Sequence, residues 1–172
     1  MLGLDGATDP AKAAAAYEAK LKGCAALAPG SAGGPPGLPR LDLVLLGLGE
    51  DAHVASLFPN APELQEPASG RWVLPITASP KPPAGRVTLS MAAINAAAAV
   101  VFVASGPGKA RPVQLVLEVQ ALPGALPAQL VRPVAGSVRW LLDGAAAGAL
   151  RPALWDQPAF WPRSEVPALP KK

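Results

Sequence analysis

The sequence contains a single cysteine and a single histidine in 172 residues. One cysteine excludes an internal disulfide framework, and one cysteine with one histidine excludes a zinc site of these two residue types within the chain. Aromatic residues make up only 5% of the chain, so a hydrophobic core must be built mainly from leucine, valine and alanine. The formal net charge of +3 is too small an excess to favour nucleic acid as a partner.

Long hydrophobic runs are also absent. The longest, residues 96–105, has about half of the ~20 residues that are needed to cross a bilayer. Residues 1–10 carry Asp5 and Asp9 and have neither a basic cluster nor an apolar segment, so no targeting signal is visible there. We therefore expect no membrane partner and a cytoplasmic location, with a plastid as the alternative.

The length predicts one domain, residues 1–151, followed by a proline-rich tail, residues 152–172. Residues 9–27 are rich in helix formers and begin with an acidic cap candidate, Asp9, before Pro10, which predicts an amphipathic helix. Residues 29–40 are rich in glycine and proline and predict a flexible loop. The tail fits no regular element, although its aromatic side chains could dock on the domain or on a partner.

Alternating apolar runs and helical patterns fill the middle of the chain. Strands are predicted at residues 41–46, 72–77, 99–104 and 137–142, the first covered on both faces and the second demoted by Pro75 to an edge. Helices are predicted at residues 87–95, 109–120 and 144–150, with Pro112 kinking the second. The alternation predicts an α/β fold, with a mostly parallel sheet in a three-layer α/β/α arrangement.

The segment Gly-Leu-Gly-Glu-Asp-Ala-His, residues 47–53, directly follows the first strand, where open α/β sheets bind ligands. Its Gly-x-Gly-x-x-Ala spacing formally satisfies the dinucleotide fingerprint. We reject that interpretation because Glu50 and Asp51 place carboxylates where a pyrophosphate would bind, and because Pro59 ends the following helix after one or two turns.

His53 is the only imidazole of the chain, so every mechanism that needs one must use it. Asp51 could orient its ring, Gly47 and Gly49 could let a substrate approach backbone N–H groups, and Ser56 would follow on the first helical turn. A packing role for the histidine stays open. No Gly-x-Ser-x-Gly elbow occurs, and Cys24, placed in the first helix, is interpreted as a small apolar residue.

A second candidate site is the loop at residues 79–86, Ser-Pro-Lys-Pro-Pro-Ala-Gly-Arg. Lys81 and Arg86 would lie next to the N-terminus of the helix predicted from residue 87, an arrangement that suits a phosphate or a carboxylate. The alternative is a solvated proline-rich turn with incidental charges.

Four segments together resemble successive blocks of the 6-phosphogluconolactonase family, within the wider group that includes glucosamine-6-phosphate deaminase: LDLVLLGLGEDAHVASLFP, SPKPPAGRVTLSMAAINAA, VVFVASGPGKA and SVRWLLDGAAA. The resemblance implies hydrolysis of 6-phospho-D-glucono-1,5-lactone in the pentose phosphate pathway, without metal or organic cofactor. It implies that His53 is the general base that activates water, that Asp51 supports it, and that Lys81 and Arg86 hold the phosphate.

Two departures from the family pattern accompany the resemblance. The family's glycine between aspartate and histidine is Ala52 here, which would cost about 1 kcal/mol if that position needs a positive φ. The family's N-terminal portion, with its glycine/serine phosphate loop, has no counterpart, so we expect an incomplete sheet with an open edge. The alternative function is thus an inactive lactonase-like subunit of a larger assembly, which binds a protein through that edge or the tail.

Overall fold

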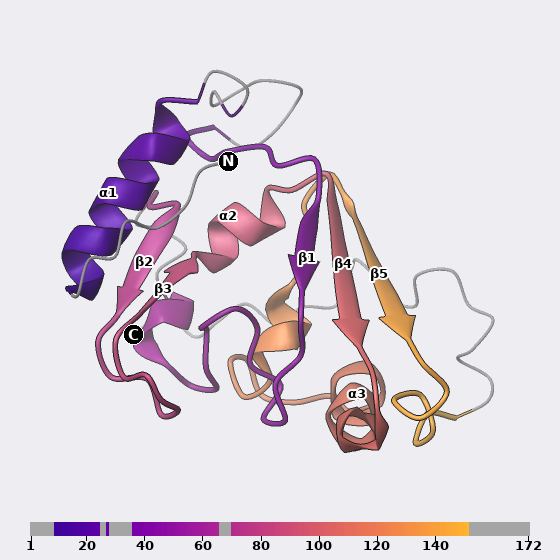
Figure 1. Ribbon diagram of the computed structural model, residues 1–172. Helices are drawn as coiled ribbons and strands as arrows, with labels where there is room; N and C mark the ends of the chain where they lie inside the picture. Colours follow the sequence, from indigo (N-terminus) through magenta and orange to yellow (C-terminus); the bar gives the residue numbers. More distant parts are fainter. Residues whose placement is uncertain (1–8, 25–26, 28–35, 66–69, 152–172) are drawn as a thin grey trace.

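The computed structural model describes residues 9–24, 27, 36–65 and 70–151, and its strands form two separate groups (Figure 1). A parallel sheet has the order β1-β4-β5, and an antiparallel hairpin pairs β2 with β3. The strands are β1 Val44–Leu46, β2 Val73–Ile76, β3 Arg86–Leu89, β4 Ala99–Ala104 and β5 Ser137–Leu142. The helices are α1 Pro10–Lys22, α2 Met91–Asn95 and α3 Ala110–Glu118, with short 3₁₀ turns η3 Pro62–Gln65, η4 Pro107–Lys109 and η5 Pro127–Leu130.

The parallel sheet confirms the predicted α/β class. β4 and β5 have the predicted bounds, and β4 is the central strand, pairing Val100 with Val44 on one side and with Val138 on the other. All three strands run in one direction, so their carboxyl ends meet at one edge of the sheet, where α3 is seen end-on (Figure 1). The loop that follows β1 begins at this edge.

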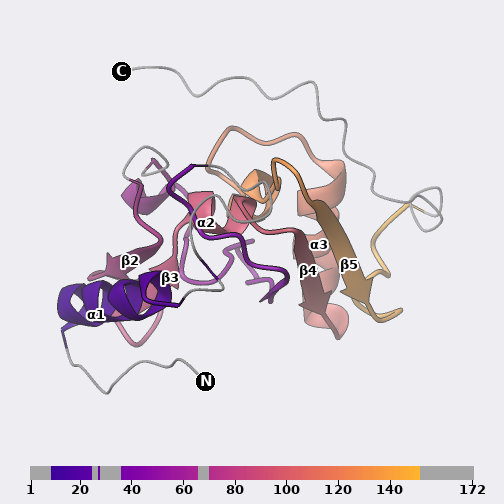
Figure 2. The same ribbon diagram turned by 90° about the horizontal axis from the view of Figure 1, so that it is seen from above.

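One face of the parallel sheet carries the main hydrophobic core. Val100 and Phe102 of β4 are fully buried, and they pack in one cluster with Ile94 of α2 and Val113 of α3. The Phe102 ring stacks on Trp140 of β5 with 4.0 Å between ring centroids. Figure 2, seen from above, shows α1 with the hairpin on one side of α2 and the parallel sheet with α3 on the other.

The opposite face of this sheet is open among the described residues. Because side chains alternate along a strand, Leu45, Val103 and Leu141 point away from the core, and they are 65%, 49% and 59% exposed. The prediction that the strand at residues 41–46 is covered on both faces is therefore wrong for the described part of the chain. In that part, no helix or strand forms the third layer of the predicted α/β/α arrangement. In the same part, β1 has a paired neighbour on one side only, β4.

The hairpin overturns the helix predicted over residues 87–95. Residues 86–89 form β3, whose backbone pairs with β2 in a register that places Val87 opposite Pro75. The helix starts only after Ser90, whose hydroxyl accepts a hydrogen bond from Ala93 N at 3.1 Å and caps α2. Pairing with a distant segment thus outweighs the helical spacing of Val87, Met91 and Ile94. The edge character predicted for residues 72–77 agrees with a two-stranded sheet.

Helix α1 begins as predicted and ends earlier. The Asp9 carboxylate accepts from Ala11 N at 2.8 Å, which confirms the acidic N-cap. The helix stops at Lys22, before Gly23, so Cys24 lies beyond it rather than within it as predicted. Of the predicted glycine/proline-rich loop, residues 29–40, the part at residues 29–35 lies outside the described residues.

Two further predictions concern the C-terminal part of the domain. The predicted helix 109–120 is found as α3, with Pro112 in its first turn. The predicted helix 144–150 is wrong, because these residues form turns in which the Asp143 carboxylate accepts from Ala146 N at 2.7 Å. That carboxylate also accepts from Gly106 N at 2.9 Å, and these backbone hydrogen bonds hold the pKa of Asp143 below its usual value. Residues 152–172 lie outside the described part.

No helix among the described residues has the length and apolar character that a membrane crossing requires.

A buried carboxylate attaches α1 to the hairpin. Glu18 is 9% exposed, and its Oε2 accepts from the backbone N–H groups of Trp72 and Val73, each at 3.1 Å. Its Oε1 pairs with Lys22. Burial raises the pKa of Glu18, but the hydrogen bond from Lys22 and those from the two backbone groups outweigh it, so the pKa lies below 4.5, the ordinary value. The ionised carboxylate therefore stabilises the contact between α1 and β2.

We predict that Glu18→Gln lowers the free energy of unfolding at neutral pH by about 1–3 kcal/mol, because the charged acceptor of two backbone N–H groups is lost. A group with a lowered folded-state pKa stabilises above its unfolded pKa and loses that effect as the pH falls through the folded value. The difference between wild type and variant should therefore shrink as the pH drops below 4.5. Urea titrations across this range measure it.

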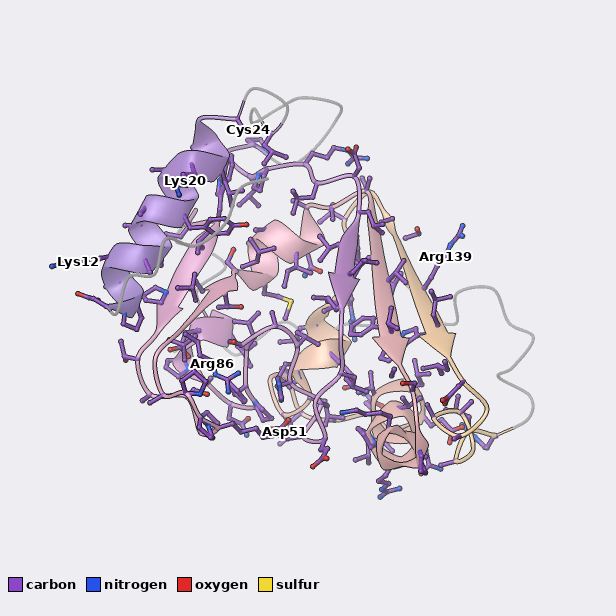
Figure 3. The ribbon with its side chains drawn as sticks, viewed as in Figure 1. Lys12, Lys20, Cys24, Asp51, Arg86 and Arg139 are labelled. Carbon is purple, nitrogen blue, oxygen red and sulfur yellow. The ribbon has the colours of Figure 1, made fainter. Side chains whose placement is uncertain are left out.

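The matched control is Lys12→Gln, which places the same new side chain at an exposed position of the same helix (Figure 3). This control should change the unfolding free energy by less than about 0.5 kcal/mol. A Glu18→Gln effect no larger than that of the control, or one that does not depend on pH, would contradict the role assigned to Glu18.

Candidate active site

The loop that leaves β1, residues 47–59, folds back on itself at the carboxyl edge of the parallel sheet. Gly49 N donates to His53 O at 2.9 Å and Ala52 N to Gly49 O at 3.0 Å. The short helix predicted here is wrong. Ala52 and Ala55 have positive φ values of 62° and 51°, which no right-handed helix allows, and Val54 pairs with Leu57 across a tight turn.

Two distant segments anchor this loop. Ala128 N of η5 donates to Ala52 O at 3.1 Å, and Ser56 N donates to the hydroxyl of Thr88 in β3 at 3.2 Å. The second bond ties the loop of the parallel sheet to the hairpin. Ser56 was expected on the first turn of a helix, and instead it lies in this loop and is buried, 8% exposed.

The Asp51 carboxylate lies 2.5 Å from the His53 ring, measured from Oδ1 to Nδ1. Partial burial raises the pKa of Asp51, but the hydrogen bonds from the His53 ring and the His53 backbone N–H outweigh it and bring the pKa below its ordinary value. An ionised carboxylate can only accept, so Nδ1 carries the proton of this hydrogen bond. In the neutral ring Nε2 then holds the lone pair, which is the arrangement of a general base.

The His53 ring is held from its other side by an aromatic contact. The ring of Phe58 lies 4.5 Å from it, centroid to centroid, at 32°, and Phe58 itself is buried. The His53 side chain keeps 18% of its surface exposed, so the ring is packed without being sealed from solvent. Phe58 was not predicted as a site residue, although it belongs to the Leu-Phe-Pro at residues 57–59 that carries part of the family resemblance.

Lys81 reaches the same carboxylate from the hairpin. Its Nζ lies 3.5 Å from Asp51 Oδ1, and the Lys81 and Asp51 side chains are 42% and 34% exposed. The two predicted constellations, 30 residues apart in sequence, are thus brought together on one carboxylate. Figure 3 shows Asp51 and Arg86 in the lower part of the view, Arg86 beside the hairpin and Asp51 on the loop below β1.

Arg86 is the first residue of β3, so the helix N-terminus expected beside it is wrong. Its guanidinium carbon lies 5.4 Å from the Phe58 ring centroid, within the range of a cation–π contact. Lys81, Asp51, His53 and Arg86 therefore form one cluster, joined through Phe58. Lys81 and Arg86 are each partly exposed, so a ligand can reach both cations.

The two glycines of the loop differ in what they do. A Cβ at position 49 would lie 2.0 Å from His53 Nδ1 and 2.7 Å from Asp51 Oδ1, whereas a Cβ at position 47 would meet nothing within 4 Å. The Gly49 N–H is also taken by His53 O. Gly49 therefore makes room for the imidazole, and this replaces the predicted role of exposing its N–H to a substrate.

No group of three metal-ligating side chains occurs within the described ranges. Cys24 is half-buried just after the end of α1, at the opposite end of the view in Figure 3 from Asp51. The arrangement that remains is an imidazole with an ionised orienting carboxylate and two cations nearby. This arrangement can take a proton from water and can bind an anionic group.

Comparison with known proteins gives one consistent family. The sequence profile described as glucosamine-6-phosphate isomerases/6-phosphogluconolactonase matches residues 2–140. The 6-phosphogluconolactonase of Rattus norvegicus is 50% identical over 113 residues, which are 66% of this chain and 42% of the rat protein. A probable 6-phosphogluconolactonase of Arabidopsis thaliana is 46% identical over 115 residues, covering 65% and 42% of the two chains.

Solved structures agree with these sequence relatives. The 6-phosphogluconolactonase of Trypanosoma brucei superposes with a TM-score of 0.67 at 33% identity, over 87% of this chain and 57% of that one. The enzyme of Leishmania guyanensis gives 0.66 at 32% identity, over 83% and 53%. Of the curated rat and Arabidopsis relatives, the chain spans less than half the length.

We predict that Gly49→Ala displaces the His53 ring, because the added methyl group would occupy the position of Nδ1. With a single histidine in the chain, the imidazole resonances in NMR belong to His53 alone. The Nδ1–H signal of the bond to Asp51 should be lost in this variant and also in Asp51→Asn. Gly144→Ala, where a Cβ meets nothing within 4 Å, should retain it, and a retained signal in Gly49→Ala would refute the packing described.

Ala52 stands where the family pattern has a glycine, and its φ is positive, 62°. An alanine is strained in this backbone conformation. We predict that Ala52→Gly raises the free energy of unfolding by about 0.2–1.2 kcal/mol, since relief of about 1–2 kcal/mol of left-handed strain exceeds the ~0.8 kcal/mol of a buried methyl group. Ala97→Gly, at a buried site without positive φ, should instead lower it by about 1 kcal/mol. Chemical denaturation measures both, and equal losses would contradict the strain at Ala52.

Proposed function

Because the chain belongs to the glucosamine-6-phosphate isomerase/6-phosphogluconolactonase family, we propose that it hydrolyses 6-phospho-D-glucono-1,5-lactone to 6-phosphogluconate. The observation that carries this proposal is the bond between Asp51 and His53, whose ring is packed against Phe58 and remains partly exposed. The 6-phosphogluconolactonase names of the relatives support the lactonase branch. The activity, the substrate and the pathway are our proposals for this chain.

In the proposed reaction, His53 Nε2 takes a proton from water while the water oxygen attacks the lactone carbonyl carbon. A tetrahedral intermediate forms, and its collapse breaks the bond between the carbonyl carbon and the ring oxygen. The protonated imidazole returns its proton to that oxygen, so one water is consumed and the base is restored. Asp51 keeps the proton on Nδ1 and stabilises the imidazolium during the step.

The loop that carries Lys81 and Arg86 supplies the positive charge for the phosphate end of the substrate. Lys81 lies beside the same carboxylate as the base, so a bound phosphate would hold the lactone ring close to His53. Such positioning makes the attack of water a reaction within one complex. For an activated ester, this is a large part of the rate increase that an enzyme provides. The proposed chemistry uses water and side chains, and we propose no cofactor.

The alternative remains an inactive lactonase-like subunit that binds a partner protein. The observation in its favour is the open sheet face, with Leu45 and Leu141 exposed. We favour the enzyme, because binding a partner through that face would not require Asp51, His53 and Lys81 to converge at the carboxyl edge. We also propose the cytoplasm as the compartment, with a plastid as the alternative.

We predict that the full chain hydrolyses freshly prepared 6-phosphogluconolactone faster than buffer does, and that His53→Gln lowers kcat by roughly 10²–10⁴-fold, the usual contribution of a positioned base. Release of acid in a pH-stat measures the rate. Lys12→Gln, an exposed change on α1, should keep the wild-type rate. Equal rates for wild type and His53→Gln would leave only the partner-binding alternative.

A further inference from the structure

The loop between β2 and β3 has a defined structure of its own. Ser79 N donates to Ala84 O at 2.9 Å and closes the loop. The Ser79 hydroxyl donates to Lys81 O at 2.7 Å and accepts from Lys81 N at 3.2 Å. The backbone of Lys81 is therefore held at both its N–H and its carbonyl oxygen, and the direction in which its side chain leaves the loop is set.

Arg86 reaches back over this loop and binds its backbone. Nη2 donates to Lys81 O and to Pro82 O, each at 2.9 Å, and Nε donates to Pro83 O at 3.1 Å. Three of the five N–H donors of a guanidinium are thus used by three consecutive carbonyl groups. A bidentate pair with a phosphate needs two parallel N–H groups on neighbouring nitrogens, and here Nε and both hydrogens of Nη2 are occupied. Nη1 is what remains for an external anion.

The same guanidinium also touches the aromatic residue that packs against the base. Its carbon lies 5.4 Å from the Phe58 ring centroid, and that ring lies 4.5 Å from the ring of His53. Arg86 therefore contacts both the loop that presents Lys81 and the ring that supports His53. Lys81 and His53 are connected twice, directly through Asp51 and indirectly through Arg86 and Phe58.

We infer that Arg86 is a positioning residue, and that Lys81 makes the charge contact with the substrate phosphate. This inference rests on the proposed function. It assigns different roles to the two cations, which the sequence places in one loop. Arg86 acts through the three carbonyl groups and through Phe58, so it sets the separation between the phosphate contact and the base. A misplacement of about 1 Å at this separation costs on the order of 100-fold in rate.

Two lactones separate a positioning role from a phosphate contact. D-glucono-1,5-lactone and its 6-phosphate have the same ring ester, and only the second carries the phosphate. We compare kcat/KM for both, above the buffer rate, in the full chain and in the variants Lys81→Met, Arg86→Met and Arg86→Lys. Arg139→Lys, an exposed arginine on β5 far from the loop (Figure 3), is the matched control and should behave as wild type.

Both Arg86 variants should lower kcat/KM for the two lactones by the same factor, roughly 10–100-fold, and leave the preference for the phosphorylated lactone within about threefold of wild type. Lys81→Met should lower kcat/KM chiefly for the phosphorylated lactone and abolish most of that preference. An Arg86→Met variant that loses only the phosphorylated lactone, or Arg86 variants that lose nothing, would overturn the inference. Arg86→Lys keeps the charge and carries the test if Arg86→Met fails to fold.

A second measurement separates this inference from the proposed function. A wild-type chain that hydrolyses neither lactone faster than buffer would contradict the proposed function. In that case the His53 imidazole resonances report ring position, and a titration with inorganic phosphate reports anion binding. Arg86→Lys should shift the His53 signals and keep the phosphate affinity within about threefold, while Lys81→Met should weaken phosphate binding. Weakened phosphate binding in Arg86→Lys with unmoved His53 signals would overturn the positioning role.

Discussion

The Asp51 carboxylate connects the parts of the chain that the proposed chemistry needs. It accepts from the ring of His53 at 2.5 Å and lies 3.5 Å from Lys81 Nζ, so one partly buried charge holds a base and a cation that come from different sheets. Its lowered pKa keeps it ionised, and an ionised carboxylate fixes the proton on Nδ1 and leaves Nε2 to act. Gly49 is part of the same constraint, because any side chain there would take the place of the ring.

The site forms where two structural units meet. The parallel sheet presents the loop with Asp51 and His53 at its carboxyl edge, and the hairpin presents Lys81. Glu18 attaches α1 to the hairpin through two backbone N–H groups, while Ser56 N bonds Thr88 across the two units. Since each unit contributes part of the cluster, the contacts between the units set the distance between base and cation.

The open face of the parallel sheet is the other prominent feature of the described residues. Parallel strands are usually covered on both faces, and here Leu45, Val103 and Leu141 are about half exposed or more. The chain also spans 42% of the rat relative. The candidate site lies at the carboxyl edge of the sheet, on the loop that follows β1 and on the loop of the hairpin, so none of the described contacts among Asp51, His53 and Lys81 involves that face.

The amino-acid sequence by itself determined the parallel strand at residues 99–104, through a continuous apolar run, the strand at residues 137–142, through its strand-forming residues, and the loop with the only histidine, through its place after an apolar strand. It also contained the family pattern. Tertiary structure alone decided that residues 86–89 form a strand, that Phe58 supports the base, and that Arg86 binds its own loop. The strand depends on pairing with residues 73–76, which outweighs the local helical spacing. The contacts of Phe58 with His53 and of Arg86 with its own loop are local, but they depend on the backbone conformation of each loop, which residue spacing does not encode.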